Sequence, residues 1–342
     1  MKRIAFLLTM TLLLSGCTTQ TAFREQVVVT AIGIHQQDSL TTVSVQAVDT
    51  LKTAANLSEQ EGSATAVYTA QSESVSAALH AFLQEAGREA TILQNQLVAV
   101  SEATCRSGSL FDSVDYLTRH RAGQLRVPIV VVTEPPAKLL ECQSGNDAIP
   151  IQSLVSMLKE GAVWGVNIRR TLLDVMLSAS GMQDMALPMI TVEDNVPTPN
   201  GAALFRDGSL VGELNTAQTM AMAILGDEAK RVLYTQNGVT YEVVLRGTAV
   251  DIAREKDGFT YRFVIKGRVA MVEKERDSRL EKERVQAWLT QQCIDTLQVL
   301  DATDCDPLGL SRRTACAFRD TTQKTVRSQL AGYDKTVLVE LD

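Results

Sequence analysis

Hydrophobic and polar positions in the first half of the chain predict several strands. Val27–Ile34 is a continuous run rich in β-branched residues, which is typical of a buried strand. After a polar turn at Gln36–Ser39, apolar and polar residues alternate over Thr42–Ala47. This alternation predicts a half-buried strand that pairs with the first as a hairpin. Further strands are expected at Leu97–Val100 and at Leu125–Thr133, where Pro128 favours a sheet edge or a bulge.

Between these strands, apolar residues recur at helical spacing. Ser72 is expected to cap a helix that buries Val75, Leu79 and Phe82. More helices are predicted at Leu110–Leu117, Pro135–Leu140, Ile151–Lys159 and Thr171–Ser178. The polar segments 50–64 and 143–150 are expected to be surface loops. Alternating strands and helices favour a mixed sheet with helices packed on it.

The last third is richer in strand signals. Asp207-Gly208 predicts a tight hairpin between Ala202–Phe205 and Leu210–Leu214. Asn215 with Gln218 resembles a capping box for a helix that ends near Gly226. Turns at Asn237-Gly238 and Asp257-Gly258 separate three further strands, expected at Val232–Thr235, Val239–Ala253 and Phe259–Val272. A long helix from about Glu275 to Leu300 follows, then a helix near Thr321–Leu330 and a strand at Val337–Leu341.

The predicted fold class is therefore α+β: mixed β-sheets with packed helices, the C-terminal part being an antiparallel meander plus a long helix. Asparagines and prolines cluster at Glu193–Gly201 and predict a domain boundary. We expect an N-terminal α+β domain at residues 27–195, with a candidate subdomain at 147–195, and a C-terminal α+β domain at residues 196–342.

The N-terminus has the pattern of a lipoprotein signal. Lys2 and Arg3 precede an apolar run, Ile4–Leu14, and the motif Leu14-Ser-Gly-Cys17 follows. The run covers about 16 Å as a helix, roughly half of a bilayer core. We therefore expect residues 1–16 to be a lipoprotein signal peptide and residues 17–26 a tether lipidated on Cys17. The alternative is an ordinary secretory peptide with a chance cysteine.

The net charge of the chain limits the classes of partner that it can bind. The chain carries a net charge of −7, and removal of residues 1–16 takes away two cations and leaves −9. Such a balance argues against nucleic acid as a partner and against a polybasic grip on anionic lipid. No other segment is long and apolar enough to predict a membrane span, so lipid on Cys17 is the expected membrane attachment.

The sequence offers little catalytic chemistry. His35, His80 and His120 have no companions at metal-ligand or nucleophile–base spacing, and we assign them structural or surface roles. There is no G-x-S-x-G elbow, Walker loop or dinucleotide fingerprint. We expect no enzyme activity, no cofactor and no metal. The cysteines after Cys17 are Cys105, Cys142, Cys293, Cys305 and Cys316; their number and spacing indicate no disulfide framework, although a bridge among the last three stays open.

Trp164 lies between two glycines in a predicted loop. An aromatic residue in this setting can anchor a partner or ligand. It can also fill an interface between domains, which is the interpretation we favour.

Several segments, in this order, resemble the Ger(x)C family of spore germination lipoproteins, the C subunits of germinant receptors. After Cys17 come Arg24-Glu25 and Val29–Ile34, although His35 stands where the family has Asp. The most similar stretch is Gly201–Leu214, which resembles the family's G-x-A-V-F-K-x-x-K-L-V-G-x-L hairpin. Other similar segments are Asn95–Glu102, Tyr116–Arg119, Ile129–Glu134 with Ala137-Lys138, and Asp306–Leu310. The C-terminal helix departs from the family in lacking tryptophan.

The resemblance implies a lipoprotein on the outer face of the spore's inner membrane. It implies integral membrane A and B subunits as partners in a nutrient germinant receptor, and no catalytic residues. The alternative is a substrate-binding lipoprotein of a transporter, which would have two α/β lobes around a cleft. The predicted antiparallel meander after residue 230 speaks against that alternative, and a cell-envelope hydrolase is a third hypothesis.

Overall fold

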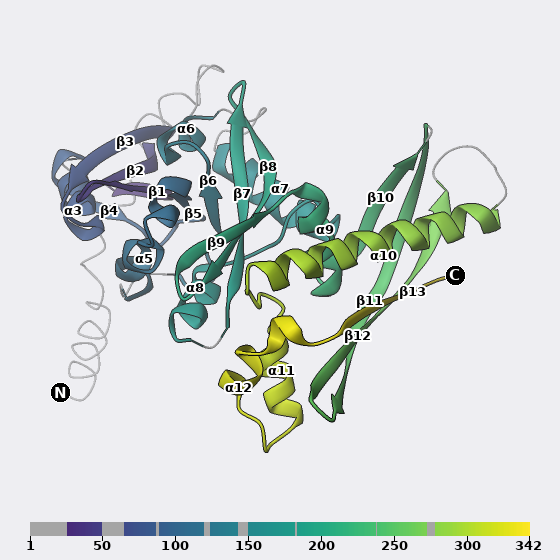
Figure 1. Cartoon of the computed structure of the whole chain (residues 1–342). Helices are drawn as coiled ribbons and strands as arrows, with labels where there is room; N and C mark the ends of the chain where they lie inside the picture. Colours follow the sequence, from purple (N-terminus) through teal and green to yellow (C-terminus); the bar gives the residue numbers. More distant parts are fainter. Residues whose placement is uncertain are drawn as a thin grey trace, which may run out of the picture.

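Two β-sheets with packed helices make up the computed structural model (Figure 1). It describes residues 26–49, 65–86, 89–119, 124–142, 150–181, 183–236, 238–271 and 278–342. The expected signal peptide, Cys17, and the loops at 50–64 and 143–149 lie outside these residues. The α+β fold class with mixed sheets is confirmed.

The larger sheet has nine strands in the order β3-β2-β1-β5-β6-β7-β8-β9, with β4 beside β1. These are β1 (Gln26–Gln37), β2 (Leu40–Asp49), β3 (Thr65–Ser72), β4 (Glu89–Thr91), β5 (Leu97–Ser101), β6 (Ile129–Val132), β7 (Met185–Glu193), β8 (Val196–Arg206) and β9 (Ser209–Leu214). The centre, β1-β5-β6-β7, is parallel and both ends are antiparallel. Every residue of β5 and β6 is buried, which explains their continuous apolar sequences.

Helices cover both faces of this sheet. They are α3 (Val75–Ala86), α4 (Glu102–Arg106), α5 (Leu110–Arg119), α6 (Pro136–Glu141), α7 (Pro150–Val163) and α8 (Leu172–Ala179). Phe82 of α3 and Val175 of α8 share one core with Ile32. Leu139 of α6 and Leu154 of α7 share the core on the other face. Strand side chains alternate between these two cores.

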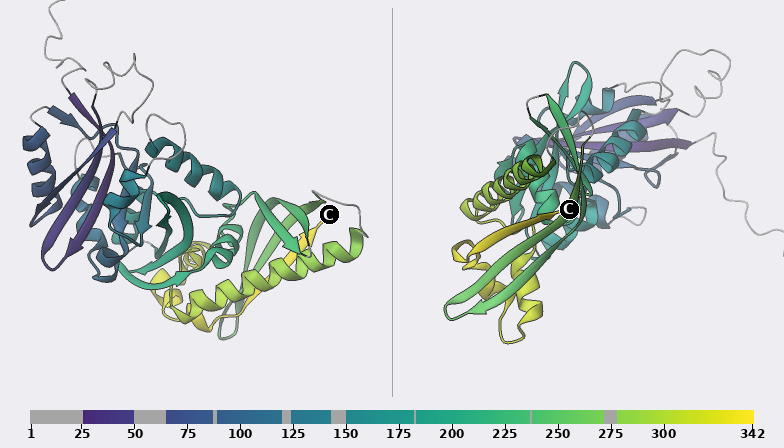
Figure 2. Two further views of the ribbon diagram at one scale, coloured as in Figure 1. Left: turned by 90° about the horizontal axis from the view of Figure 1, so that it is seen from above. Right: turned by 90° about the vertical axis from the view of Figure 1, so that its right-hand side faces the viewer.

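The smaller sheet has four strands, β10 (Arg231–Gln236), β11 (Val239–Glu255), β12 (Gly258–Met271) and β13 (Lys335–Leu341). The first three form the predicted antiparallel meander, and β13 joins β12 in parallel. The helices of this part are α9 (Thr216–Leu225), α10 (Ser278–Ala302), α11 (Leu310–Ala317) and α12 (Gln323–Arg327), followed by the 3₁₀ turn η2 (Leu330–Gly332). The long helix α10 runs along this sheet toward the nine-stranded one (Figure 2), and Val285, Leu289 and Cys293 are buried in its core.

Some predicted boundaries were wrong. Ser72 ends β3, a strand that we did not predict, and the Ser74 hydroxyl instead accepts a hydrogen bond from the Ala77 N–H at 3.2 Å at the start of α3. The strand expected at Leu125–Thr133 is shorter and begins at Ile129, because the Val127 N–H donates to the Gln124 carbonyl in a turn and Pro128 has no N–H for a ladder. The helix expected at Thr321–Leu330 is divided between α12 and η2.

The expected division between residues 195 and 196 falls in the β7–β8 turn. Asp194 and Asn195 adopt positive φ there, 48° and 65°, as hairpin turns require. The nine-stranded sheet continues beyond this turn through β8 and β9. The helices of the candidate subdomain, α7 and α8, pack on opposite faces of that sheet. The division into domains stays a prediction about how the chain is organised.

Candidate functional site

The histidines that the structure describes have ordinary surroundings. His35 lies at the end of β1, with its Nδ1 2.8 Å from the Ser101 hydroxyl. Ser101 in turn contacts Thr104, whose hydroxyl accepts the Gln36 N–H at 2.7 Å. This network holds β1 against the start of α4. His80 is exposed on α3, and His120 lies outside the described residues.

No group of three or more His, Cys, Asp or Glu side chains is arranged to hold a metal ion in the part of the chain that the structure describes. The described cysteines all carry free thiols, so none of the three considered for a bridge is bonded. Four are buried, and burial raises the pKa of Cys105 and of Cys293 to about 12. Cys316 is exposed. Among the described helices, none is long and apolar enough to cross a membrane.

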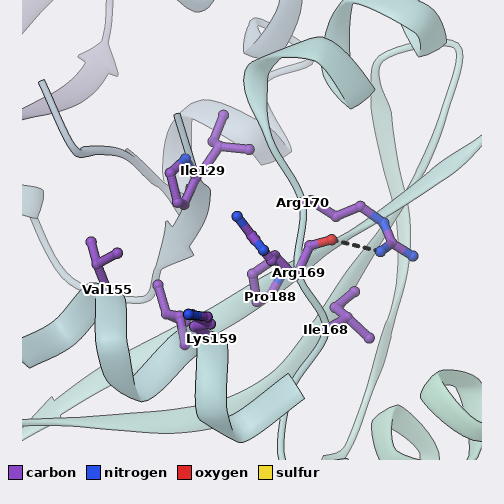
Figure 3. Close-up of a pocket in the computed structure, with 9 residues that line it drawn as sticks. Ile129, Val155, Lys159, Ile168, Arg169, Arg170 and Pro188 are labelled. Atoms are coloured by element: carbon purple, nitrogen blue, oxygen red, sulfur yellow. Dashed lines mark hydrogen bonds between the residues drawn. The ribbon is translucent and has the colours of Figure 1, made fainter. Parts of the chain in front are cut away.

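A small cavity lies between α7 and the segment that follows it (Figure 3). Ile129, Val155 and Ile168 contribute apolar walls, and the Arg170 guanidinium donates to the Arg169 carbonyl at 2.7 Å beside it. Its volume is about 50 Å³. Ligand pockets typically measure about 300–1,000 Å³, so this cavity has room for water and little else.

A polar groove of about 760 Å³ lies where the C-terminal helices meet the nine-stranded sheet. Arg327 of α12 pairs with Asp184 at 2.6 Å and with Asp304 at 2.6 Å. Asp304 also pairs with Arg206 at the end of β8, at 2.6 Å. These side chains form ion pairs with one another, and the pairs join the C-terminal helices to the nine-stranded sheet.

A second opening has a different character. It has a volume of about 410 Å³ and is largely apolar, and both tryptophans of the chain, Trp164 and Trp288, line it. Val166 and Leu233 also line it and are 47% and 52% exposed. We call this opening the tryptophan hollow; Gly165, Thr216, Ala217 and Met220 complete its lining.

Local structure places the two indoles. Trp164 follows α7, and Gly165 turns the chain with φ of +65°. A Cβ at Gly165 would lie only 3.0 Å from Cγ1 of Val232 in β10, so the chain passes close to that strand. Trp288 comes from α10, and its ring lies against Tyr234 with centroids 4.7 Å apart.

The surroundings of Trp164 combine the two interpretations considered from the sequence. The Arg231 guanidinium lies 5.3 Å from the centre of the Trp164 ring, a cation–π arrangement between the α7 side and β10. Trp164 therefore contacts the small-sheet part of the molecule, yet it also lines an open apolar surface. Sequence reasoning missed Trp288 and Leu233, because no local pattern indicates that α10 and β10 bring them beside Trp164. The tryptophan hollow is the candidate functional site.

Comparison with known proteins assigns the chain to one group. Residues 20–192 match the family model described as "Spore germination protein N-terminal domain". Residues 200–329 match the model described as "Spore germination B3/ GerAC like, C-terminal". The crystal structure of the GerBC protein shares the fold, with a TM-score of 0.57 at 10% identity, over 91% of this chain and 96% of that one. No curated protein matches the chain.

Proposed function

Because the chain belongs to the family of spore germination proteins of the B3/GerAC type, we propose that it is the lipid-anchored, non-catalytic subunit of a nutrient germinant receptor. In this role it acts in spore germination together with the membrane-embedded A and B subunits. The observation that carries the proposal is the pair of family matches, which together extend over most of the chain.

The sequence around Cys17 supports the anchoring. A lipobox-like motif ends at this residue, and β1 begins at Gln26. The eight residues between them span about 26–29 Å at most. A thioether-linked lipid on Cys17 would therefore hold the folded body close to the bilayer, on the outer face of the spore's inner membrane, within reach of membrane-embedded partners.

Several polar side chains are held in structural hydrogen bonds and ion pairs, which supports a non-catalytic role. Asp184 and Arg327 pair with each other, and His35 is tied to Ser101. The pairs among Asp184, Arg206, Asp304 and Arg327 thus give the charges of the polar groove structural partners, and the largely apolar tryptophan hollow has the composition of a protein-binding surface.

The test is replacement of the anchor in a spore-forming host. Cys17→Ala should release the protein from the membrane fraction and lower nutrient germination to the level of a gene deletion. Cys316→Ala, which changes an exposed free thiol, is the matched control and should leave both unchanged. A Cys17→Ala protein that stays on the membrane and germinates normally on nutrients would overturn the proposal.

A further inference from the structure

Strand β10 has an open edge. In the part of the chain that the structure describes, it forms one end of the four-stranded sheet and has β11 as its single partner strand. The Leu245 N–H donates to the Lys230 carbonyl at 2.9 Å, which fixes the alternation of the ladder. In an antiparallel pair, every second residue exchanges hydrogen bonds with the partner strand. Backbone N–H and C=O groups of Arg231, Leu233 and Thr235 therefore point away from β11, toward the open edge.

The tryptophan hollow extends around this edge. Val232 and Tyr234 are buried on the face that α10 covers, where Trp288 lies against Tyr234. Side chains alternate along a strand, so Leu233 points to the opposite face. Both Leu233 and Trp288 line the hollow. Because Leu233 and Trp288 lie on opposite faces of β10, the tryptophan hollow extends across the open backbone edge of this strand.

We propose that an extended segment of a membrane-embedded partner subunit adds to the open edge of β10 and places an apolar side chain in the tryptophan hollow. This inference rests on the proposed function, which supplies the membrane partner. The mode is strand addition, in which backbone hydrogen bonds and side-chain pockets act together.

The chemistry of the edge selects a polypeptide as the occupant. Donors and acceptors alternate along β10, and a second extended backbone offers the matching acceptors and donors at the same repeat. A lipid tail would fill the apolar walls but leave the N–H and C=O groups of Leu233 and Thr235 without partners, which is costly once they are desolvated.

The site fixes the length and the anchor of the added segment. The Lys230 N–H already donates to the Val163 carbonyl at 2.8 Å, so the end of α7 lies at the start of this edge and new pairing is limited to the stretch around Leu233 and Thr235. So short a ladder gives few hydrogen bonds. The apolar side chain between Trp164 and Trp288 should therefore provide most of the binding free energy, as buried anchors do at interfaces.

The first experiment uses the full-length lipidated chain in spores and measures the recovery of A and B subunits with it from detergent-solubilised membranes. Leu233→Lys places a charge in the hollow and should lower that recovery by about tenfold or more, since a charge is poorly tolerated in a desolvated apolar pocket. The matched control is Val196→Lys, which changes another exposed apolar residue, 57% exposed, in β8. Recovery of partners with the control should equal that of the wild type.

The second experiment places a photo-crosslinking amino acid at Thr235, with Asp251 of β11 as the control position on the same sheet. The inference is supported if Thr235 crosslinks to one continuous segment of a membrane-embedded subunit and Asp251 does not. Crosslinks from Thr235 only to a second copy of this chain would overturn it in favour of self-association. Partner recovery that survives Leu233→Lys would also overturn it while leaving the proposed function intact. Failure of the wild type to recover either subunit would count against the proposed function itself.

Discussion

Arg327 donates two hydrogen bonds to one carboxylate oxygen of Asp184, at 3.1 Å from Nε and 2.6 Å from its terminal nitrogen. Asp184 precedes β7 of the large sheet, and Arg327 ends α12 near the C-terminus. The same Asp184 oxygen accepts the Asp306 N–H at 2.8 Å. One carboxylate thus joins the large sheet to two points of the C-terminal segment.

Arg327→Ala should destabilise the fold by about 2–4 kcal/mol, because it leaves a mostly buried carboxylate without its cation. The side chains of Arg327 and Asp184 are only 20% and 10% exposed. Chemical denaturation of the purified protein measures the change. Arg246→Ala removes an equally short but exposed pair with Asp342 and should have a much smaller effect. Equal losses in the two variants would contradict this account.

Gly201→Ala should be severely destabilising. Gly201 has φ of +87°, and an added Cβ would lie 2.0 Å from the Leu214 carbonyl oxygen. Gly238 has φ of +73° but nothing within 4 Å of such a Cβ. Gly238→Ala therefore measures only the conformational cost of a positive φ at a non-glycine residue, about 1–2 kcal/mol. Gly201→Ala should lower the unfolding temperature clearly more than Gly238→Ala does. Similar unfolding temperatures for the two variants would show that the hairpin relaxes around the methyl group.

Thiol chemistry should separate Cys316 from the other described cysteines. Burial keeps Cys105 and Cys293 protonated by raising the pKa of each to about 12, so among the described cysteines the native protein should react rapidly at Cys316. Cys316→Ser should abolish that rapid phase.

Counting the thiols of the unfolded protein provides a second test of lipidation at Cys17. The chain has six cysteines, and lipid on Cys17 would block one of them. Protein purified from spore membranes should therefore titrate as five thiols in denaturant under reducing conditions. Six thiols would count against lipidation, whatever the result for Cys316.

Acid should weaken the fold partly through Glu134. Burial alone would raise its pKa, but hydrogen bonds from Thr133, the Val192 N–H and Thr191 hold the pKa below its usual value. A lowered folded-state pKa means that the stabilisation is complete above the ordinary glutamate pKa of about 4.3 and is lost as pH falls through the folded-state pKa. The wild type should lose more unfolding free energy than Glu134→Gln between about pH 5 and pH 2.5. Parallel curves for the two proteins would exclude this contribution.

Local signals in the sequence predicted local structure well. Asp207-Gly208 forms the expected turn because both residues adopt positive φ, 51° and 80°. Asn215 and Gln218 make the expected capping box, with hydrogen bonds of 2.9 and 3.0 Å in the two directions. Such features depend on a few neighbouring residues, so their sequence patterns are sufficient.

Features that depend on contacts between distant residues could not be predicted from the sequence. Residues of β3 are mostly half-buried, and Thr65–Ser72 has too weak an alternation to indicate a strand without its partner β2. The hollow between Trp164 and Trp288 is a further case, because it forms only where α10 and the end of α7 meet β10. Helix α11, which we did not predict, begins at Leu310, whose N–H donates to the Asp306 carboxylate at 2.8 Å.

Strand β13 is the last strand of the small sheet in the sequence. It inserts beside β12, made some seventy residues earlier, and its Val339 and Leu341 complete the core beneath α10. The small sheet therefore stays unfinished until residue 341 has left the ribosome, and its late, long-range pairing is the kind that slows folding. For the exported lipoprotein proposed above, this delay would keep the C-terminal half open during synthesis, when translocation needs an unfolded polypeptide.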